Sequence, residues 1–143
     1  MKDYLEKRRE ELRKQGGFTL MEMLIVVAII AVLVAIAIPI FTSQLENSRE
    51  AADAGNIRGA YAEVMANAVT NGSEYSETVT LTQQQDGWQS DAGDKLAGQG
   101  LVSGSAHTAV KIDGTPKKGG TAEVKYTPGT SSKDPAVTIT FSA

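Results

Sequence analysis

The residues most able to do chemistry lie near the N-terminus, where two glycines, Gly16 and Gly17, stand directly before Phe18. Cleavage of the chain after Gly17 would give Phe18 a free α-amine, four residues before the carboxylate of Glu22. Within one helix these two groups are neighbours, and between two laterally stacked helices the same pair could set the axial register. The spacing therefore predicts a charge pair that proteolysis creates.

An apolar segment, residues 18–41, must position that pair, and Glu22 is its one charged residue. Residues 18–38 would form a helix of about 31 Å at about 1.5 Å per residue, which matches the thickness of a hydrocarbon core. The segment is apolar all round from Met23 to Ile38, whereas a buried helix of a globular protein keeps a polar stripe. We therefore expect a membrane-spanning helix.

Glu22 requires an explanation, since an acid at the centre of such a span costs roughly 2.5–3.5 kcal/mol, and somewhat less near the interface. One explanation is that Glu22 lies close enough to the end of the span to reach the lipid headgroups. The other is that a cation on another chain meets its charge, which suits an assembling helix better than a solitary anchor.

Charge is segregated along the chain and predicts the orientation of the span. Residues 1–17 carry six basic and four acidic side chains, whereas residues 42–143 carry eight basic and twelve acidic ones. Basic residues before a span favour a cytoplasmic N-terminus, which places residues 42–143 outside. A secretory signal peptide fits less well, because the apolar run exceeds the usual 7–15 residues and the glycine pair precedes it.

Composition excludes several classes of function. The chain has 143 residues, a net charge of −3, no cysteine and one histidine, His107. These counts exclude a disulfide framework, a thiolate metal site and a histidine-based metal site. No nucleophile–base spacing, phosphate loop or metal motif is present, so we expect no enzyme and no cofactor. The acidic balance argues against a nucleic-acid surface.

A resemblance to a known family lies in the stretch Gly17-Phe18-Thr19-Leu20-Met21-Glu22 and the apolar run through Pro39. These residues resemble the N-terminus of type IV pilins and pseudopilins, with a class III leader. The resemblance implies cleavage after Gly17 by a prepilin peptidase, N-methylation of Phe18, and an assembly role for Glu22 against a neighbouring subunit's terminus. Pro39 is similar to the position where the helix kinks or melts in filaments, because proline removes a backbone hydrogen bond. The lack of cysteine favours a Gram-positive type.

The resemblance implies three parts: a cleaved leader (1–17), a transmembrane and assembly helix (18–41), and an extracytoplasmic head (42–143). It implies a structural subunit of a pilus-like filament that serves adhesion, twitching motility or DNA uptake. Its partners would be the peptidase, an assembly ATPase with its platform protein, minor pilins and copies of itself. A pseudopilin of a secretion or competence system is the alternative, and the acidic, turn-rich head favours the major pilin. A membrane-anchored binding module is a further alternative, but this function would not explain the glycine pair or Glu22.

In the head, the spacing of apolar residues predicts that the helix continues to about residue 69 and ends at Thr70-Asn71-Gly72. We expect one apolar side on this helix, made by Phe41, Leu45, Ile57, Tyr61, Met65 and Ala68. The opposite, solvent-facing side would carry Glu46, Arg49, Glu50, Asp53 and Glu63.

The C-terminal region alternates in the manner of half-buried strands at residues 108–112, 121–127 and 136–142. Three antiparallel strands packed on the helix would give an α+β fold. The inward-facing residues would be Val110, Ile112, Ala122, Val124, Tyr126, Val137, Ile139 and Phe141. In the less regular middle, residues 79–82 could form a short strand and residues 91–101 a short helix, with Trp88 as a core anchor.

Overall fold

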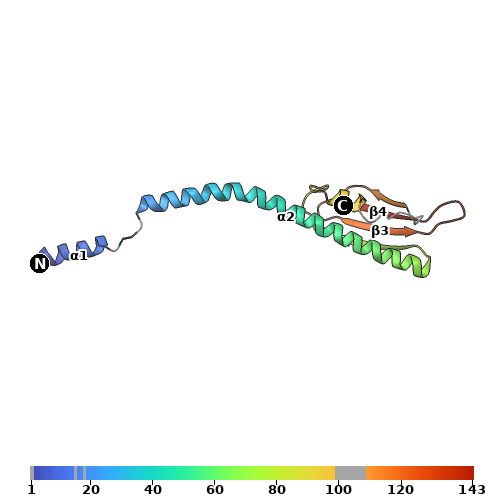
Figure 1. The fold of residues 1–143 in the computed structure, drawn as a ribbon, viewed down its shortest axis with the longest axis horizontal. Coiled ribbons are helices and arrows are strands. Elements are labelled where there is room, and N and C mark those ends of the chain that lie inside the picture. Colours follow the sequence, from blue (N-terminus) through green and yellow to red (C-terminus); the bar gives the residue numbers. More distant parts are fainter. Residues whose placement is uncertain (1, 15, 18, 99–108) are drawn as a thin grey trace. The chain divides into compact units, whose positions relative to one another are not determined.

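The computed structural model describes residues 2–14, 16–17, 19–98 and 109–143. The fold is α+β, as predicted, and the chain divides into two compact units, residues 1–41 and 42–143. We call the second unit the head; the long helix contributes to both units. In chain order the elements are α1 (Lys2–Lys14), α2 (Leu20–Asn71), β1 (Tyr75–Thr80), α3 (Ala92–Gly98), β2 (Ala109–Asp113), β3 (Thr121–Thr127) and β4 (Ala136–Ser142) (Figure 1).

The limits of α2 lie close to those that the sequence indicates, with an end at Asn71 rather than residue 69. Gly72 stops the helix. Its φ of 63° lies in the left-handed region that favours glycine, and its N–H donates to the carbonyl of Ala68 at 2.9 Å. This conformation ends α2 just before β1 begins.

The sheet has four strands in the order β1-β3-β4-β2, and it is mixed. Strand β3 pairs antiparallel with both β1 and β4, whereas β2 pairs parallel with β4. The prediction of three antiparallel strands is therefore wrong in number and in the direction of β2. Alternating apolar residues identify a strand and its inward face but carry no information on the direction of its partner. Strand β3 pairs with β4 on one side and with β1 on the other, so β2 pairs with the free edge of β4.

Strand β1 also differs from the short strand expected at residues 79–82, since it covers Tyr75–Thr80. The predicted strand overlaps it only at Val79 and Thr80. Leu81 is buried in the core, and the backbone N–H groups that follow it bind a helix carboxylate rather than a strand. The predicted short helix is confirmed as α3, within the range expected for it.

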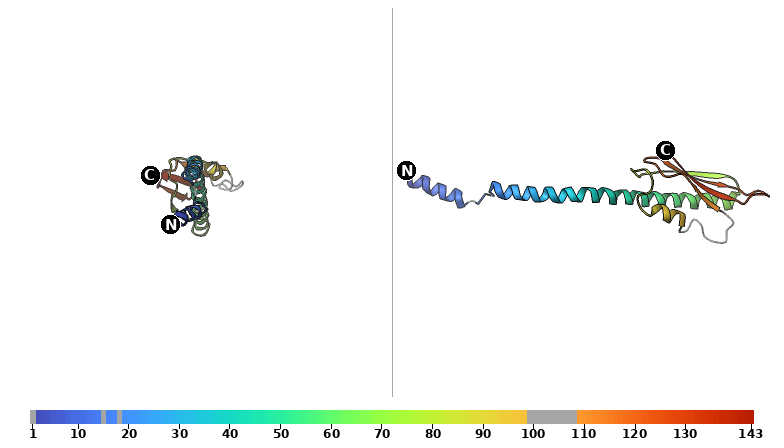
Figure 2. Two further views of the ribbon diagram at one scale, coloured as in Figure 1. Left: turned by 90° about the vertical axis from the view of Figure 1, so that its left-hand side faces the viewer. Right: turned by 90° about the horizontal axis from the view of Figure 1, so that it is seen from above.

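The core of the head lies between one face of α2 and the sheet, which runs along the C-terminal part of that helix (Figure 2). Ile57 and Val64 are fully buried there. The predicted inward faces are confirmed: Ala122, Val124, Val137, Ile139 and Phe141 are buried, and Val110, Ile112 and Tyr126 pack against them. Trp88 also packs on this core, with its ring edge-on to Phe141 at a centroid distance of 6.0 Å.

Candidate functional site

Gly17, the first residue of the predicted cleavage junction, lies between the end of α1 at Lys14 and the start of α2 at Leu20. Gly17 is exposed, and a Cβ built on it would meet no heavy atom of the described residues within 4 Å. The fold around Gly17 therefore gives no steric reason for a glycine, so a demand for glycine would come from a molecule that binds the junction. Phe18, the other half of the junction, and His107 lie outside the described residues.

Glu22 takes part in a reciprocal cap at the start of α2. The backbone N–H of Thr19 donates to Oε2 of Glu22 at 2.7 Å, and the N–H of Glu22 donates to Oγ1 of Thr19 at 3.2 Å. This is a capping box, which gives acceptors to two N–H groups at the helix start and places a carboxylate at the positive end of the helix dipole. Both residues are exposed, so the carboxylate can be reached from outside the chain.

The role of Thr19 escaped the sequence analysis, which treated Glu22 only as a charge to be neutralised. The signal was present in the sequence: a threonine followed three residues later by a glutamate, directly before an apolar run, is typical of a helix start. The cap is local, and both of its residues follow the Gly17–Phe18 junction, so cleavage there would leave both in the product.

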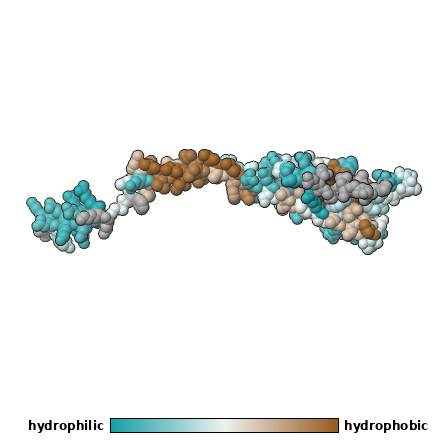
Figure 3. Space-filling model, in the orientation of Figure 1, coloured by the Kyte–Doolittle hydropathy of each residue, from teal (hydrophilic) through white to brown (hydrophobic). Residues whose placement is uncertain are grey.

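Residues 20–41 of α2 expose apolar side chains on all sides of the helix, and Figure 3 shows one face of this apolar band. Among the described residues, α2 is the one helix long and apolar enough to cross a membrane. The helix is continuous through Pro39, so the structure contains no break there. Proline cannot donate the usual hydrogen bond to the residue four positions earlier, and the kink implied by the resemblance stays a prediction.

Three buried carboxylates on α2 contradict the expectation of a solvent-facing acidic side. Glu46 is 2% exposed, and Glu50 and Asp53 are fully buried. We call these three residues the carboxylate row. Their spacing of four and three residues places them on one face of the helix. The prediction for them was wrong, because acids at helical spacing were taken to face water.

The physical reason is that the loop at residues 82–90 offers backbone N–H groups that no strand satisfies. Asp53 accepts from the N–H groups of Thr82 and Gln83, each at 2.9 Å, and from the Thr82 hydroxyl at 2.8 Å. Glu50 accepts from the N–H groups of Gln89 and Ser90 at 2.5 and 2.8 Å. Buried charges are tolerated when such donors surround them.

Glu46 completes the row by binding the middle of the same loop. It accepts from the N–H groups of Gln84 and Gln85 at 2.6 and 2.8 Å, and from Arg49 at 3.2 Å. Burial acts to raise the pKa of Glu46. The two backbone N–H groups and the Arg49 guanidinium outweigh that effect and hold the pKa of Glu46 below its ordinary value of 4.5. The row thus anchors the loop that carries Trp88 into the core.

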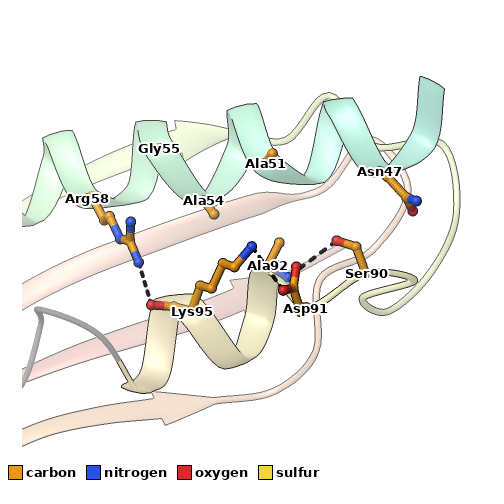
Figure 4. A pocket seen from close by; sticks show the side chains of 9 residues that line it. All are labelled: Asn47, Ala51, Ala54, Gly55, Arg58, Ser90, Asp91, Ala92 and Lys95. Carbon is orange, nitrogen blue, oxygen red and sulfur yellow. Dashed lines mark hydrogen bonds and ion pairs between the residues drawn. The ribbon is translucent and has the colours of Figure 1, made fainter. Parts of the chain in front are cut away.

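A groove of about 330 Å³ lies in the head between α2 and α3. Figure 4 shows small α2 residues along one side of the groove, among them Ala51, Ala54 and Gly55. Its two cations are engaged within the chain: Arg58 donates to the carbonyl of Lys95, and the Lys95 ammonium pairs with Asp91 at 2.9 Å. Over the described ranges no group of three acidic or histidine side chains is placed to hold a metal ion. The Arg58 hydrogen bond thus joins α2 to α3 across the groove.

Comparison with known proteins gives a match at the N-terminus. Residues 12–38 match the family model described as the prokaryotic N-terminal methylation motif. No curated protein and no solved structure matches the chain. The matched range includes the glycine pair, Phe18, the Thr19–Glu22 cap and most of the exposed apolar part of α2. The class III leader motif and the apolar helix support membrane anchoring. The motif thus supports the identification of this chain as a type IV pilin or pseudopilin.

Proposed function

We propose that the chain is the precursor of a structural subunit of a type IV pilus-like filament and has no enzymatic role. The precursor spans the membrane once, with its leader in the cytoplasm and its head outside. A prepilin peptidase removes residues 1–17, and Phe18 becomes the methylated N-terminus. The subunit then polymerises through residues 18–41 and reaches the cell surface as a homopolymer.

The observation that carries the proposal is Glu22, an exposed carboxylate at the start of a helix segment whose other exposed side chains are apolar. An anchor that only holds a protein in lipid gains from this acid no more than the cap with Thr19, and a charged acid in a span has a cost. A helix that packs against copies of itself gains a register, since the carboxylate of one subunit meets the α-amine of Phe18 on the next.

The capping box supports this mechanism, because it places the Glu22 carboxylate at the end of α2 where the new terminus forms. Thr19 and Glu22 both remain after cleavage, so the cap orients the carboxylate in the precursor and in the mature subunit alike. The apolar surface of residues 20–41 is covered by lipid before assembly and by neighbouring helices afterwards.

The partners that follow from this mechanism are other copies of the chain, the peptidase, an assembly ATPase with its platform protein, and minor pilins. The head would form the outer surface of the filament and serve adhesion, motility or DNA uptake. A pseudopilin of a secretion or competence system has the same N-terminal chemistry, and the methylation motif fits both.

The experiment is an intact-mass measurement on the protein from sheared cell-surface material and, in parallel, from membranes. We expect a species that begins at methylated Phe18 and is abundant in the sheared fraction. The same species confined to membranes would assign the chain to the pseudopilins. A full-length chain in both fractions would overturn the proposed processing and with it the filament function.

A further inference from the structure

Helix α1 has two faces of different chemistry. Leu5 and Leu12 are two turns apart and therefore share a face, and both are largely exposed, at 62% and 66%. Arg8 and Arg9 lie between them on that same face. Three of the four acids of α1 recur at a spacing that puts them on the opposite face: Asp3, Glu6 and Glu10.

Six of the 13 residues of α1 are basic. Over the part of the chain that the structure describes, five of them form no ion pair with an acidic side chain: Lys2, Lys7, Arg8, Arg9 and Arg13. A helix that turns leucines and arginines to one side, and three acids with Lys7 among them to the other, is suited to the interface of an anionic bilayer.

The distance to the span limits where α1 can be. Helix α1 ends at Lys14 and α2 begins at Leu20, so even a fully extended connection between them reaches no more than about 20 Å. If residues 20–41 are in the membrane, α1 is tethered within that distance of the lipid headgroups. Charge complementarity and this short tether both point to the same surface.

We propose that α1 lies on the anionic lipid surface of the cytoplasmic leaflet. Leu5 and Leu12 insert at the interface, Arg8 and Arg9 bind headgroup phosphates, and the acidic face turns to water. This inference rests on the proposed membrane anchoring of the precursor. It gives the leader a second role, because the Gly17–Phe18 junction is then held at the bilayer surface, at a constant depth for the peptidase.

The test uses the full-length precursor in vesicles and relies on the lack of cysteine, which allows single labels without other changes. Leu12→Cys, Glu10→Cys and Val32→Cys variants are labelled with the polarity-sensitive fluorophore NBD. Each is reconstituted in phosphatidylcholine alone and in phosphatidylcholine with added phosphatidylglycerol. Glu10→Cys is the matched control on the opposite face of α1, and Val32→Cys reports on the span.

In vesicles with phosphatidylglycerol we expect the emission of the Leu12→Cys label to be several-fold more intense than that of the Glu10→Cys label. Its emission maximum should also lie at a shorter wavelength. The difference should collapse in phosphatidylcholine alone, and also when Arg8→Gln and Arg9→Gln are added together. The Val32→Cys label should be bright in both kinds of vesicle.

The remaining outcomes overturn the inference in distinguishable ways. Equal emission from Leu12→Cys and Glu10→Cys beside a bright Val32→Cys label would reject the surface-bound leader and leave the anchored precursor intact. A dim Val32→Cys label would reject membrane insertion, and with it both proposals. A Leu12→Cys label that brightens only when prepilin peptidase is added would assign this face of α1 to the enzyme rather than to lipid.

Discussion

The two halves of α2 form one continuous helix and meet opposite surroundings. Residues 20–41 are apolar on every side, and none of the described residues covers them. Residues 42–71 bury a single face beneath a loop and a sheet of their own chain, through Glu46, Glu50, Asp53, Ala54, Ile57, Ala60, Val64 and Ala68. Folding of the head therefore uses the second half of α2 alone, and the first half stays available for the assembly proposed above. The apolar face of the second half is covered by other segments of the chain. The apolar surface of the first half is left for lipid or other helices to cover.

The buried face of the second half is itself divided. From Glu46 to Asp53 it is acidic and binds loop N–H groups, and from Ile57 to Ala68 it is apolar and packs on the sheet. The spacing of three and four residues is the same throughout, so one helical face serves both kinds of burial. If the two halves are independent, a substitution in one half should leave the property of the other half unchanged.

The largest effect is expected at the junction before the first half. Gly17→Val should block cleavage, and Gly17→Ala should slow it. The physical reason is that nothing in the described residues crowds Gly17, so the restriction would come from the peptidase pocket. The measurement is the mass of the accumulated chain, with Gly16→Ala as control. Processing of Gly17→Val at the wild-type rate would refute the predicted site.

Glu22→Ala should abolish filaments while cleavage continues, because the partner of the Phe18 amine is lost. The head should unfold at the same denaturant concentration as the wild type, since the hydrogen bonds of the Thr19–Glu22 cap are local to the start of α2. Filaments are measured by shearing and electron microscopy, with the exposed Glu63→Ala as control. Normal assembly of Glu22→Ala would show that the charge pair is not used.

Ile57→Ala and Ile36→Ala make the same change in the two halves of α2. Ile57 is fully buried against the sheet, so we expect its loss to cost the head about 3 kcal/mol of unfolding free energy. Ile36 is exposed, and its substitution should change that free energy by less than about 0.5 kcal/mol. Urea unfolding of the full chain in detergent, followed through the single Trp88, measures both. Equal destabilisation would mean that the halves fold as one unit.

Asp53→Ala should cost about 2 kcal/mol, because it leaves the N–H and hydroxyl of Thr82 and the N–H of Gln83 without their acceptor. Glu63→Ala, on the exposed side of the same helix, is the matched control. If both variants unfold alike, the carboxylate row does not anchor the loop. Urea unfolding in detergent again provides the measurement.

A smaller effect is expected from pH through Glu46. Because its pKa is lowered in the folded chain, Glu46 contributes stability that is complete above its ordinary value of 4.5 and is lost as the pH falls through the folded-state pKa. The wild type should therefore exceed Glu46→Gln in unfolding free energy near neutral pH, and the gap should shrink in acid. A gap that is constant with pH would exclude this titration.

The sequence predicted the elements of the head better than their arrangement. The strands at residues 121–127 and 136–142 were predicted at their observed limits, because an alternating pattern is a local property of the chain. The parallel direction of β2 and the pairing of β1 were missed, because strand partners lie far apart in the sequence. Phe41 and Leu45 were assigned to the buried stripe of α2 and are exposed.

The candidate site shows the same division. Gly17, Phe18 and Glu22 were singled out by their spacing, whereas their roles in cleavage, methylation and assembly came from the family resemblance; the methylation-motif match covers all three positions. Thr19 was missed although its signal is local, whereas Glu46, Glu50 and Asp53 could not have been placed. Their burial depends on donors between residues 82 and 90, roughly thirty to forty positions away.

By itself the sequence determined the features that depend on neighbours along the chain: the apolar span, the glycine pair before it, the acid within it and the periodicity of helix and strands. The tertiary structure alone decided which face of α2 is buried and what covers it. The physical reason is that an acid at helical spacing faces water unless a distant segment brings backbone donors to it. In this chain the loop after β1 brings them.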